Sequence, residues 1–368
     1  MPKEVSHILL AEKSVELMAS SKNKKKALIG VTLESIAKKY PKAFAFGSVA
    51  PDIFFYDIKF PWERKNKPRG LSWGERIHGN LGEHTLKHII LQLETLRAKN
   101  IPYSLEQKEM LFAFSLGYLT HVALDSIIHP IVYYFAGNYY DQNPAEKQKS
   151  EMRHRVMETI LDLYNLDFYH SDLKKFDALK KIRLNSSERK TIFQFYAWSL
   201  EATWPQFVLK RVTLRKLVYR GYKKLFGFNR LFQNRLFARC ALKWNRIKND
   251  KISFYSSLVY PAKNYETYLS SSEHRLFKIE DLSVYRNPLT NQEKHINPNY
   301  LRKKVLARVH RFFTVAYKLY KAETNPADAE TKLKGYSLNH GQVGLRTDAM
   351  AYFSPLPVNG NFEWSHQS

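Results

Sequence analysis

The chain has 368 residues, enough for one large domain or two ordinary ones with an ample core. A hydrophobic content of 44% and an aromatic content of 14% exclude a disordered chain. Cys240 is the single cysteine, which excludes an internal disulfide and a thiolate zinc cluster. The formal net charge of +25 favours anionic partners such as phosphoryl groups, acidic membranes or nucleic acid, without choosing among them.

The first part of the chain, residues 1–170, is predicted to be mainly helical. Its apolar periodicity predicts helices over 5–19, 26–40, 77–97, 107–129 and 146–165. The segment 43–76 is expected to be irregular, because Pro51 and Pro61 interrupt any regular element. Pro130 has no amide hydrogen, so the helix that precedes it should kink or end near His129.

Beyond residue 170 the chain becomes strongly basic, with thirteen Lys or Arg and no acidic residue between Pro205 and Asp250. Two apolar stripes at helical spacing flank Gly227 and predict a helical hairpin. They consist of Leu214, Leu217, Val218, Tyr222 and Leu225, and of Phe237, Cys240, Ala241, Trp244 and Ile247. The basic side chains either face water or dock an anionic surface, and both alternatives stay open.

A further helix over 300–322 completes the organisation that the sequence predicts. Residues 171–322 are expected to form a basic helical extension packed on or beside the first part. Residues 323–368 lack periodicity and are expected to be irregular. The predicted fold class is therefore mainly α.

The most informative pattern is a polar row in an apolar helix. His121, Asp125 and His129 follow one another at four-residue intervals, which on a helix advance only about 40° per step. Their side chains therefore leave one face of the helix. His154 and Glu158, again four residues apart, add a second pair from the next helix. Imidazole and carboxylate groups that converge in this way are what a zinc site requires.

The same helix has a competing interpretation as a membrane span. Residues 111–137 carry one formal charge and are long enough to cross a bilayer. An aspartate and two histidines would be costly in lipid, so a buried helix beside a metal site is the favoured interpretation. The residues from Met1 to His7 lack the apolar segment of a signal peptide. We therefore expect a cytoplasmic protein, at most peripherally attached to a membrane.

The row and the His154/Glu158 pair together supply ligands for more than one ion. His129, His154 and Glu158 make three ligands for one ion, and three protein ligands leave a position for water, as in catalytic zinc sites. His121 and Asp125 face another ion, which needs ligands from earlier in the chain. Asp52 and His78 are candidates for these ligands. Their rivals are Asp57, His84 and His88, and His7 is placed to reach a third ion that shares Asp125.

These residues together resemble the zinc-dependent phospholipases C, a superfamily shared with the zinc-dependent single-strand nucleases. The resemblance covers about residues 1–165. It rests on His7, the Gly-Ser-Val-Ala-Pro-Asp segment ending at Asp52, His78, the segment from Gly117 through Asp125 to His129-Pro130, and His154-xxx-Glu158. The resemblance implies a multi-helix bundle of that family, followed here by the basic extension.

The resemblance also implies a ligand set for each zinc ion. The first zinc would be held by Asp52, His78, His121 and Asp125, and the second by His129, His154 and Glu158. A third would be held by His7, Asp125 and the free amino terminus. Secreted relatives begin with tryptophan at that terminus, whereas removal of Met1 here would leave Pro2.

The activity that the resemblance implies is hydrolysis of a phospholipid phosphodiester by metal-activated water. Asp52 would help to orient or deprotonate that water. The alternatives are a zinc-dependent nuclease or small-molecule phosphoesterase with the same site, and a non-catalytic membrane-associated protein that keeps zinc structurally. An apolar rim would favour a lipid substrate, whereas stacking aromatics would favour nucleic acid.

Overall fold

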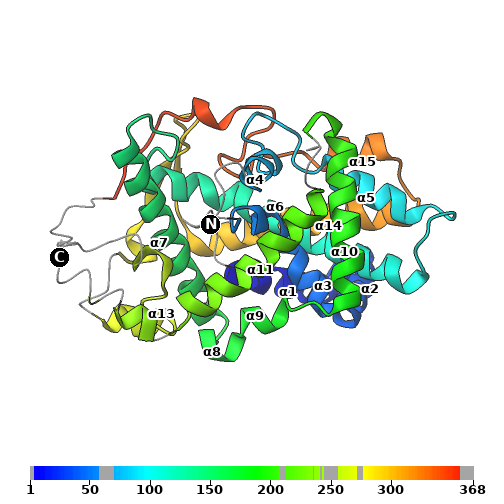
Figure 1. Cartoon of the computed structure of the whole chain (residues 1–368), viewed down its shortest axis with the longest axis horizontal. Helices are drawn as coiled ribbons and strands as arrows, with labels where there is room; N and C mark the ends of the chain where they lie inside the picture. Colours follow the sequence, from blue (N-terminus) through cyan, green and yellow to red (C-terminus); the bar gives the residue numbers. More distant parts are fainter. Residues whose placement is uncertain are drawn as a thin grey trace.

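The computed structural model describes residues 4–57, 70–207, 213–234, 236–240, 243, 256–271 and 277–356, and confirms a mainly helical fold (Figure 1). The longer helices are α1 (Glu4–Ala19), α2 (Lys24–Lys39), α5 (Lys87–Arg97), α6 (Leu105–Ala136), α7 (Pro144–Phe168), α10 (Ser186–Thr203), α11 (Leu214–Phe232) and α14 (Pro298–Tyr320). The shorter ones are α3 (Pro41–Gly47), η1 (Ala50–Phe54), α4 (Leu71–Ile77), α8 (Leu173–Phe176), α9 (Ala178–Lys181), η2 (Pro205–Phe207), η3 (Ser256–Leu258), α13 (Tyr265–Ser270), η4 (Ile279–Asp281), α15 (Pro326–Lys332) and η5 (Thr347–Ala349). Two short strands, β1 (Val284–Arg286) and β2 (Glu293–His295), pair antiparallel.

Helix α6 runs through the middle of the molecule, and α1, α3, α5, α7 and α14 pack against it (Figure 1). It begins at a capping box, in which the Ser104 hydroxyl accepts from the Gln107 amide and the Gln107 side chain accepts from the Ser104 amide. Among the described residues α6 alone is long and apolar enough to cross a membrane, and 89% of its most apolar window is buried inside the protein. That burial favours the core-helix interpretation.

Of the two alternatives expected at Pro130, a kink or an end near His129, the end is wrong, because α6 continues through Pro130 to Ala136. Proline cannot donate to the carbonyl of Ser126, four residues earlier. Gly341 approaches that carbonyl so closely that a Cβ on Gly341 would lie 2.3 Å from the oxygen. The carbonyl that Pro130 leaves without its helical donor is thus covered by the C-terminal segment.

Helix α3 lies unusually close to α6. A Cβ on Gly117 would lie 2.0 Å from the Phe44 carbonyl oxygen, and one on Gly47 would lie 2.1 Å from the Phe114 carbonyl oxygen. Only glycine permits this approach of two backbones. The contact fixes η1, which follows α3 directly and carries Asp52, over the polar row of α6.

The predicted helix over 77–97 is wrong in its first half. Helix α4 ends at Ile77, and α5 begins only at Lys87. Gly79 and Gly82 adopt positive φ angles of 76° and 85°, which turn the chain between the two helices. The apolar side chains that favoured one long helix lie in α5.

The later part of the chain packs into the same core as the first part. One hydrophobic cluster contains Leu116 of α6, Leu200 of α10, Val218 of α11, Phe312 of α14 and Leu338. The domain limits at 170 and 322 stay predictions. The expected helix over 300–322 corresponds to α14, and the segment expected to be irregular contains α15. The turn that was predicted at Gly227 is wrong, because α11 continues through Gly227 to Phe232. Of the predicted second helix, residues 236–240 are helical, and most of the rest lies outside the described residues.

Candidate metal centre

Four imidazole and carboxylate side chains converge against the middle of α6. Asp52 comes from η1, His78 follows the last residue of α4, and His121 and Asp125 stand on successive turns of α6. All four are buried, and one ligand atom from each lies within 4.8 Å of those of the others. The structure thus brings together the four residues that were predicted for the first ion.

Backbone carbonyls orient both imidazoles of this first group. His121 Nδ1 donates to the Ser48 carbonyl oxygen at 2.8 Å, and His78 Nδ1 donates to the Gly74 carbonyl oxygen at 2.7 Å. Each ring therefore turns Nε2 towards the centre of the group. An imidazole that ligates a metal commonly donates its other nitrogen in this way, which fixes its tautomer and direction.

The two Nε2 atoms face carboxylates rather than donors. His121 Nε2 lies 2.9 Å from Asp125 Oδ2, and His78 Nε2 lies 3.2 Å from Asp52 Oδ1. With its proton on Nδ1, a neutral ring would present a lone pair here, so that lone pairs would face lone pairs in a buried space. A cation between them resolves the conflict. Zinc accepts a donor set of imidazole nitrogens and carboxylate oxygens without sulfur, so the residues present fit the ion.

A second group lies one helical turn further along α6. His129 Nε2 is 3.2 Å from Glu158 Oε1, and His154 Nε2 is 2.9 Å from the same oxygen. His154 and Glu158 stand on successive turns of α7, and all three side chains are buried. These are the three residues that were predicted for the second ion.

Asp125 joins the two groups and also contacts α1. Its Oδ2 faces His121, whereas its Oδ1 lies 3.6 Å from His129 Nε2 and 3.3 Å from His7 Nε2. The His7 ring stacks on that of His121, with centroids 4.0 Å apart. His7 therefore stands beside both groups, as expected of a residue that shares Asp125.

The titration behaviour of the centre reflects its concentrated charge. Burial alone would raise the pKa of Asp125, but His121, His129 and His7 hold that pKa well below its usual range. Burial opposes the charging of His121, yet Asp125 and Asp52 raise its pKa to about 9. Burial lowers the pKa of His7 to about 4. In the absence of metal, the carboxylates therefore hold a proton on His121, at the place where a divalent cation would bind.

The rival ligands have other partners. Asp57 pairs with Arg220 and Lys224 of α11 and accepts from a backbone amide. His88 is enclosed by aromatic rings, and burial lowers its pKa to about 3. His84 accepts a backbone amide through Nδ1. Neither histidine nor Asp57 belongs to the two groups.

Aromatic and amide side chains form a wall that the sequence analysis missed. The ring of Tyr133 lies 4.9 Å from His154 and 6.1 Å from His129, and Tyr139 lies 5.7 Å from His154. The Tyr133 hydroxyl donates to Asn339 at 3.1 Å. Tyr133 continues the four-residue interval after His129, so the spacing held a signal for it. Asn339 gave no such signal, because it approaches from 206 residues away.

Comparison with known proteins places the chain in a family. Residues 6–206 match the family model described as zinc dependent phospholipase C. The chain has no significant match among curated proteins or solved structures. The matched range covers more than half of the chain and contains both groups as well as His7. From this match the chain belongs to the zinc-dependent phospholipase C family.

Proposed function

We propose that the protein hydrolyses the phosphodiester of a phospholipid, with zinc ions held by the two groups. The first zinc would be bound by Asp52, His78, His121 and Asp125, and the second by His129, His154 and Glu158. A third would be shared by His7 and Asp125. The observation that carries the proposal is the bridging carboxylate of Asp125, which supports two buried donor groups side by side.

The role of the ions is electrostatic. Bound zinc would neutralise the phosphodiester and lower the pKa of water towards neutrality. The residues of the chain supply the remaining functions. Asp52 is buried beside His78 and His121, with its Oδ1 atom 3.2 Å and 3.7 Å from their Nε2 atoms. These contacts support a role for its carboxylate in orienting the attacking water and accepting its proton.

The surroundings of the centre favour a lipid substrate over nucleic acid. A cavity beside His7, Asp125, His129 and Glu158 is lined mainly by aliphatic side chains. Single-stranded nucleic acid requires aromatic platforms on which bases stack. The rings around His154 are edge-on to the imidazoles, Tyr133 is buried and Tyr139 is half-buried, so this wall offers no such open platform.

We expect the purified protein to contain about two equivalents of zinc, because two groups of donors are present. Strong chelators should remove zinc together with phosphodiesterase activity. His154→Gln should lower the zinc content by about one equivalent, whereas His310→Gln should keep it, because His310 bonds the Ser14 carbonyl outside the centre. Elemental analysis by mass spectrometry measures the zinc content of the wild type and of each variant. Zinc below one equivalent after supplementation would contradict the proposal.

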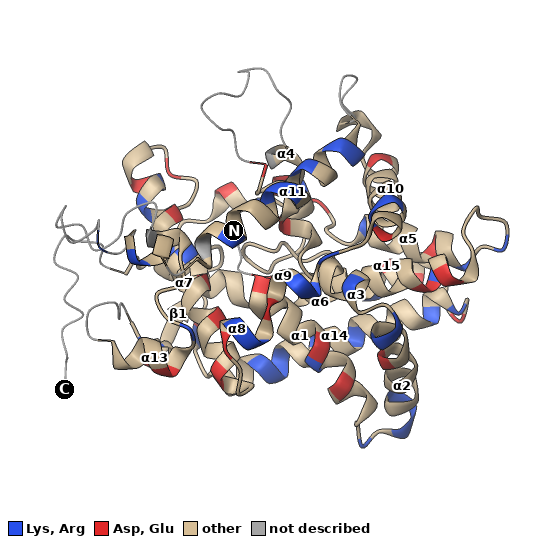
Figure 2. Ribbon diagram, turned by 60° about the horizontal axis from the view of Figure 1, so that its bottom comes forward, with Lys and Arg blue, Asp and Glu red and all other residues tan. Residues whose placement is uncertain are grey.

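The basic face of α11 is proposed to attach the enzyme to anionic membranes. Helix α11 packs on η1, and Lys and Arg recur along it (Figure 2). Arg220 and Lys224 pair with Asp57, so they serve the fold. The residues left on the outer face are Arg215, Lys216, Lys223 and Arg230, all exposed. Basic residues near an anionic membrane contribute about 1 kcal/mol each.

Charge reversal tests this attachment. Changing Arg215, Lys216, Lys223 and Arg230 to Glu should weaken sedimentation with anionic liposomes, more strongly at low salt. Hydrolysis of a soluble chromogenic phosphodiester and zinc content should not change. The matched control reverses four exposed lysines elsewhere: Lys22, Lys24, Lys25 and Lys42. Equal sedimentation of both variants and the wild type at every salt concentration would leave α11 as a solvated face.

A further inference from the structure

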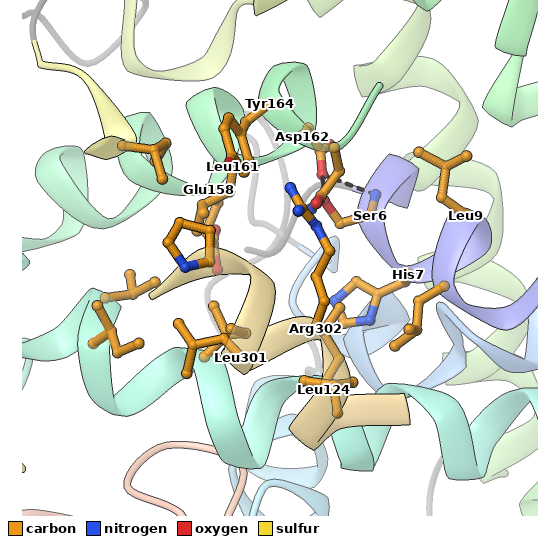
Figure 3. Close-up of a pocket in the computed structure, with 18 of the residues that line it drawn as sticks. Ser6, His7, Leu9, Leu124, Glu158, Leu161, Asp162, Tyr164, Leu301 and Arg302 are labelled. Atoms are coloured by element: carbon orange, nitrogen blue, oxygen red, sulfur yellow. Dashed lines mark hydrogen bonds between the residues drawn. The ribbon is translucent and has the colours of Figure 1, made fainter. Parts of the chain in front are cut away.

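A cavity of about 120 Å³ lies beside the candidate metal centre, between α1, α6, α7 and α14 (Figure 3). His7, Asp125, His129 and Glu158 form part of its wall. The rest of the wall is mainly aliphatic and includes Leu10, Leu124, Ile128, Met157, Leu161, Leu301, Val305 and Leu306. For comparison, an apolar cavity of about 150 Å³ inside a protein binds benzene. The space is somewhat smaller but of the same order, so it suits a short run of methylene groups.

The aliphatic wall is not closed by the protein itself. Leu124 and Ile128 flank the polar row on α6, Leu161 faces them from α7, and Leu301 and Leu306 reach in from α14. All five stay only half-buried although they lie between packed helices. Side chains that filled a core would be covered by one another. These five therefore keep a surface that a ligand can cover.

One nitrogen of Arg302, on the wall of the cavity, is left without a hydrogen-bond acceptor among the described residues. The Arg302 guanidinium lies 3.5 Å from the centre of the Phe168 ring, and its Nη1 donates to the Asn299 side chain at 2.9 Å. Its buried Nη2 has no hydrogen-bond partner among the described residues. A buried donor without an acceptor is costly. An ester carbonyl inside the cavity would supply that acceptor.

We propose that this cavity takes one fatty acyl chain of the lipid substrate, an inference that rests on the proposed function. Four residues of the candidate centre belong to its wall, so a glycerolipid with its phosphodiester at the centre has the cavity within reach. The aliphatic wall suits methylene groups, and Arg302 suits the ester that joins them to glycerol. Helix α14 lies outside the family-matched range 6–206, so this chain's own C-terminal part builds one wall of the slot.

The proposal predicts a dependence of activity on acyl length. Soluble, monomeric phosphatidylcholines with butanoyl, hexanoyl and heptanoyl chains are compared with a chromogenic phosphodiester that has no acyl chain. Each methylene buried in an apolar site gains about fourfold in affinity. The ratio kcat/KM should therefore rise by about fourfold per methylene until the cavity is filled. If the enzyme hydrolyses the chromogenic substrate but kcat/KM for the phosphatidylcholines does not change with acyl length, the acyl slot is overturned and the proposed function stays intact.

Filling the cavity tests its location. Leu306→Trp should flatten the chain-length series and leave chromogenic hydrolysis and zinc content unchanged. Leu28→Trp is the matched control, because Leu28 is 72% exposed on α2 and does not line the cavity. It should retain the full series. A steep series in Leu306→Trp would overturn the proposal, and Leu301→Phe serves as a second, smaller filling should the first variant fold poorly.

A binding measurement separates failure of the slot from failure of catalysis. Dihexanoylglycerol carries the acyl chains but no phosphodiester, so its binding does not require hydrolysis. Calorimetry should show that dihexanoylglycerol binds the wild type and the Leu28→Trp protein. Its affinity for the Leu306→Trp protein should be at least tenfold lower. Binding without activity on any phosphodiester would support the slot and reject the proposed function. Equal binding to all three proteins, or none to the wild type, would reject the slot.

Discussion

Replacing Asp125 with asparagine should be the most damaging single change in the protein. The substitution keeps the size of the side chain but removes the negative charge that faces His121, His129 and His7. Because this carboxylate joins both candidate groups, we expect zinc content to fall below one equivalent and phosphodiester hydrolysis to be lost. Stability should fall by about 3 to 5 kcal/mol, the usual cost of breaking a buried ion pair. Elemental analysis and thermal unfolding measure the two effects.

Asp57→Asn is the matched control for this change. Asp57 is as buried as Asp125, and it also pairs with cationic side chains, Arg220 and Lys224. Its replacement should lower stability by a comparable amount while zinc content stays near two equivalents. A destabilised protein thus differs measurably from one that has lost its metal ligands. Full zinc content and activity in Asp125→Asn would contradict the assignment of this residue.

Replacing Asp52 with asparagine should reduce turnover while leaving most of the fold and much of the metal in place. The amide cannot accept a proton from water, and removal of a general base reduces turnover by about 10² to 10⁴-fold. The second group, on α6 and α7, does not include Asp52, so its zinc should remain. We expect thermal stability to fall much less than in Asp125→Asn. Steady-state kinetics on a soluble phosphodiester, with zinc analysis of the same sample, measures the separation.

Asp52→Glu gives the complementary result. It restores a carboxylate at a displaced position, so part of the turnover lost in Asp52→Asn should return. Turnover in Asp52→Asn within tenfold of the wild type would remove Asp52 from the proton transfer. The residue would then serve only to hold metal.

The local periodicity of the chain predicted much of the helical framework and the grouping of the candidate ligands. The interval of four residues in α6 and in α7 places donors on one face whatever surrounds them, and the structure brings the same seven residues into the same two groups. Asp52 and His78 lie on short elements without periodicity. Their inclusion came from the family resemblance, and the close contact of α3 with α6 at Gly117 explains how η1 reaches the row.

The features that were missed depend on distant segments. Helix α6 passes through Pro130 because Gly341 covers the exposed carbonyl of Ser126. The break between α4 and α5 depends on glycines with positive φ, which also bring His78 and Asn80 against the C-terminal segment. The Leu338 amide donates to the His78 carbonyl, and the Thr347 amide donates to that of Asn80. Local patterns carry no information on such partners.

The packing of α14 against α6 decides what counts as a folding unit in this chain. Phe112 of α6 stacks on Tyr320 with ring centroids 4.1 Å apart, and Val309, Phe312 and Phe313 are fully buried. All four α14 residues lie beyond position 206, where the family match ends. A fragment cut at that position would expose one side of the helix that carries the polar row. We therefore expect the segment that bears every candidate ligand to need α14 for stable folding.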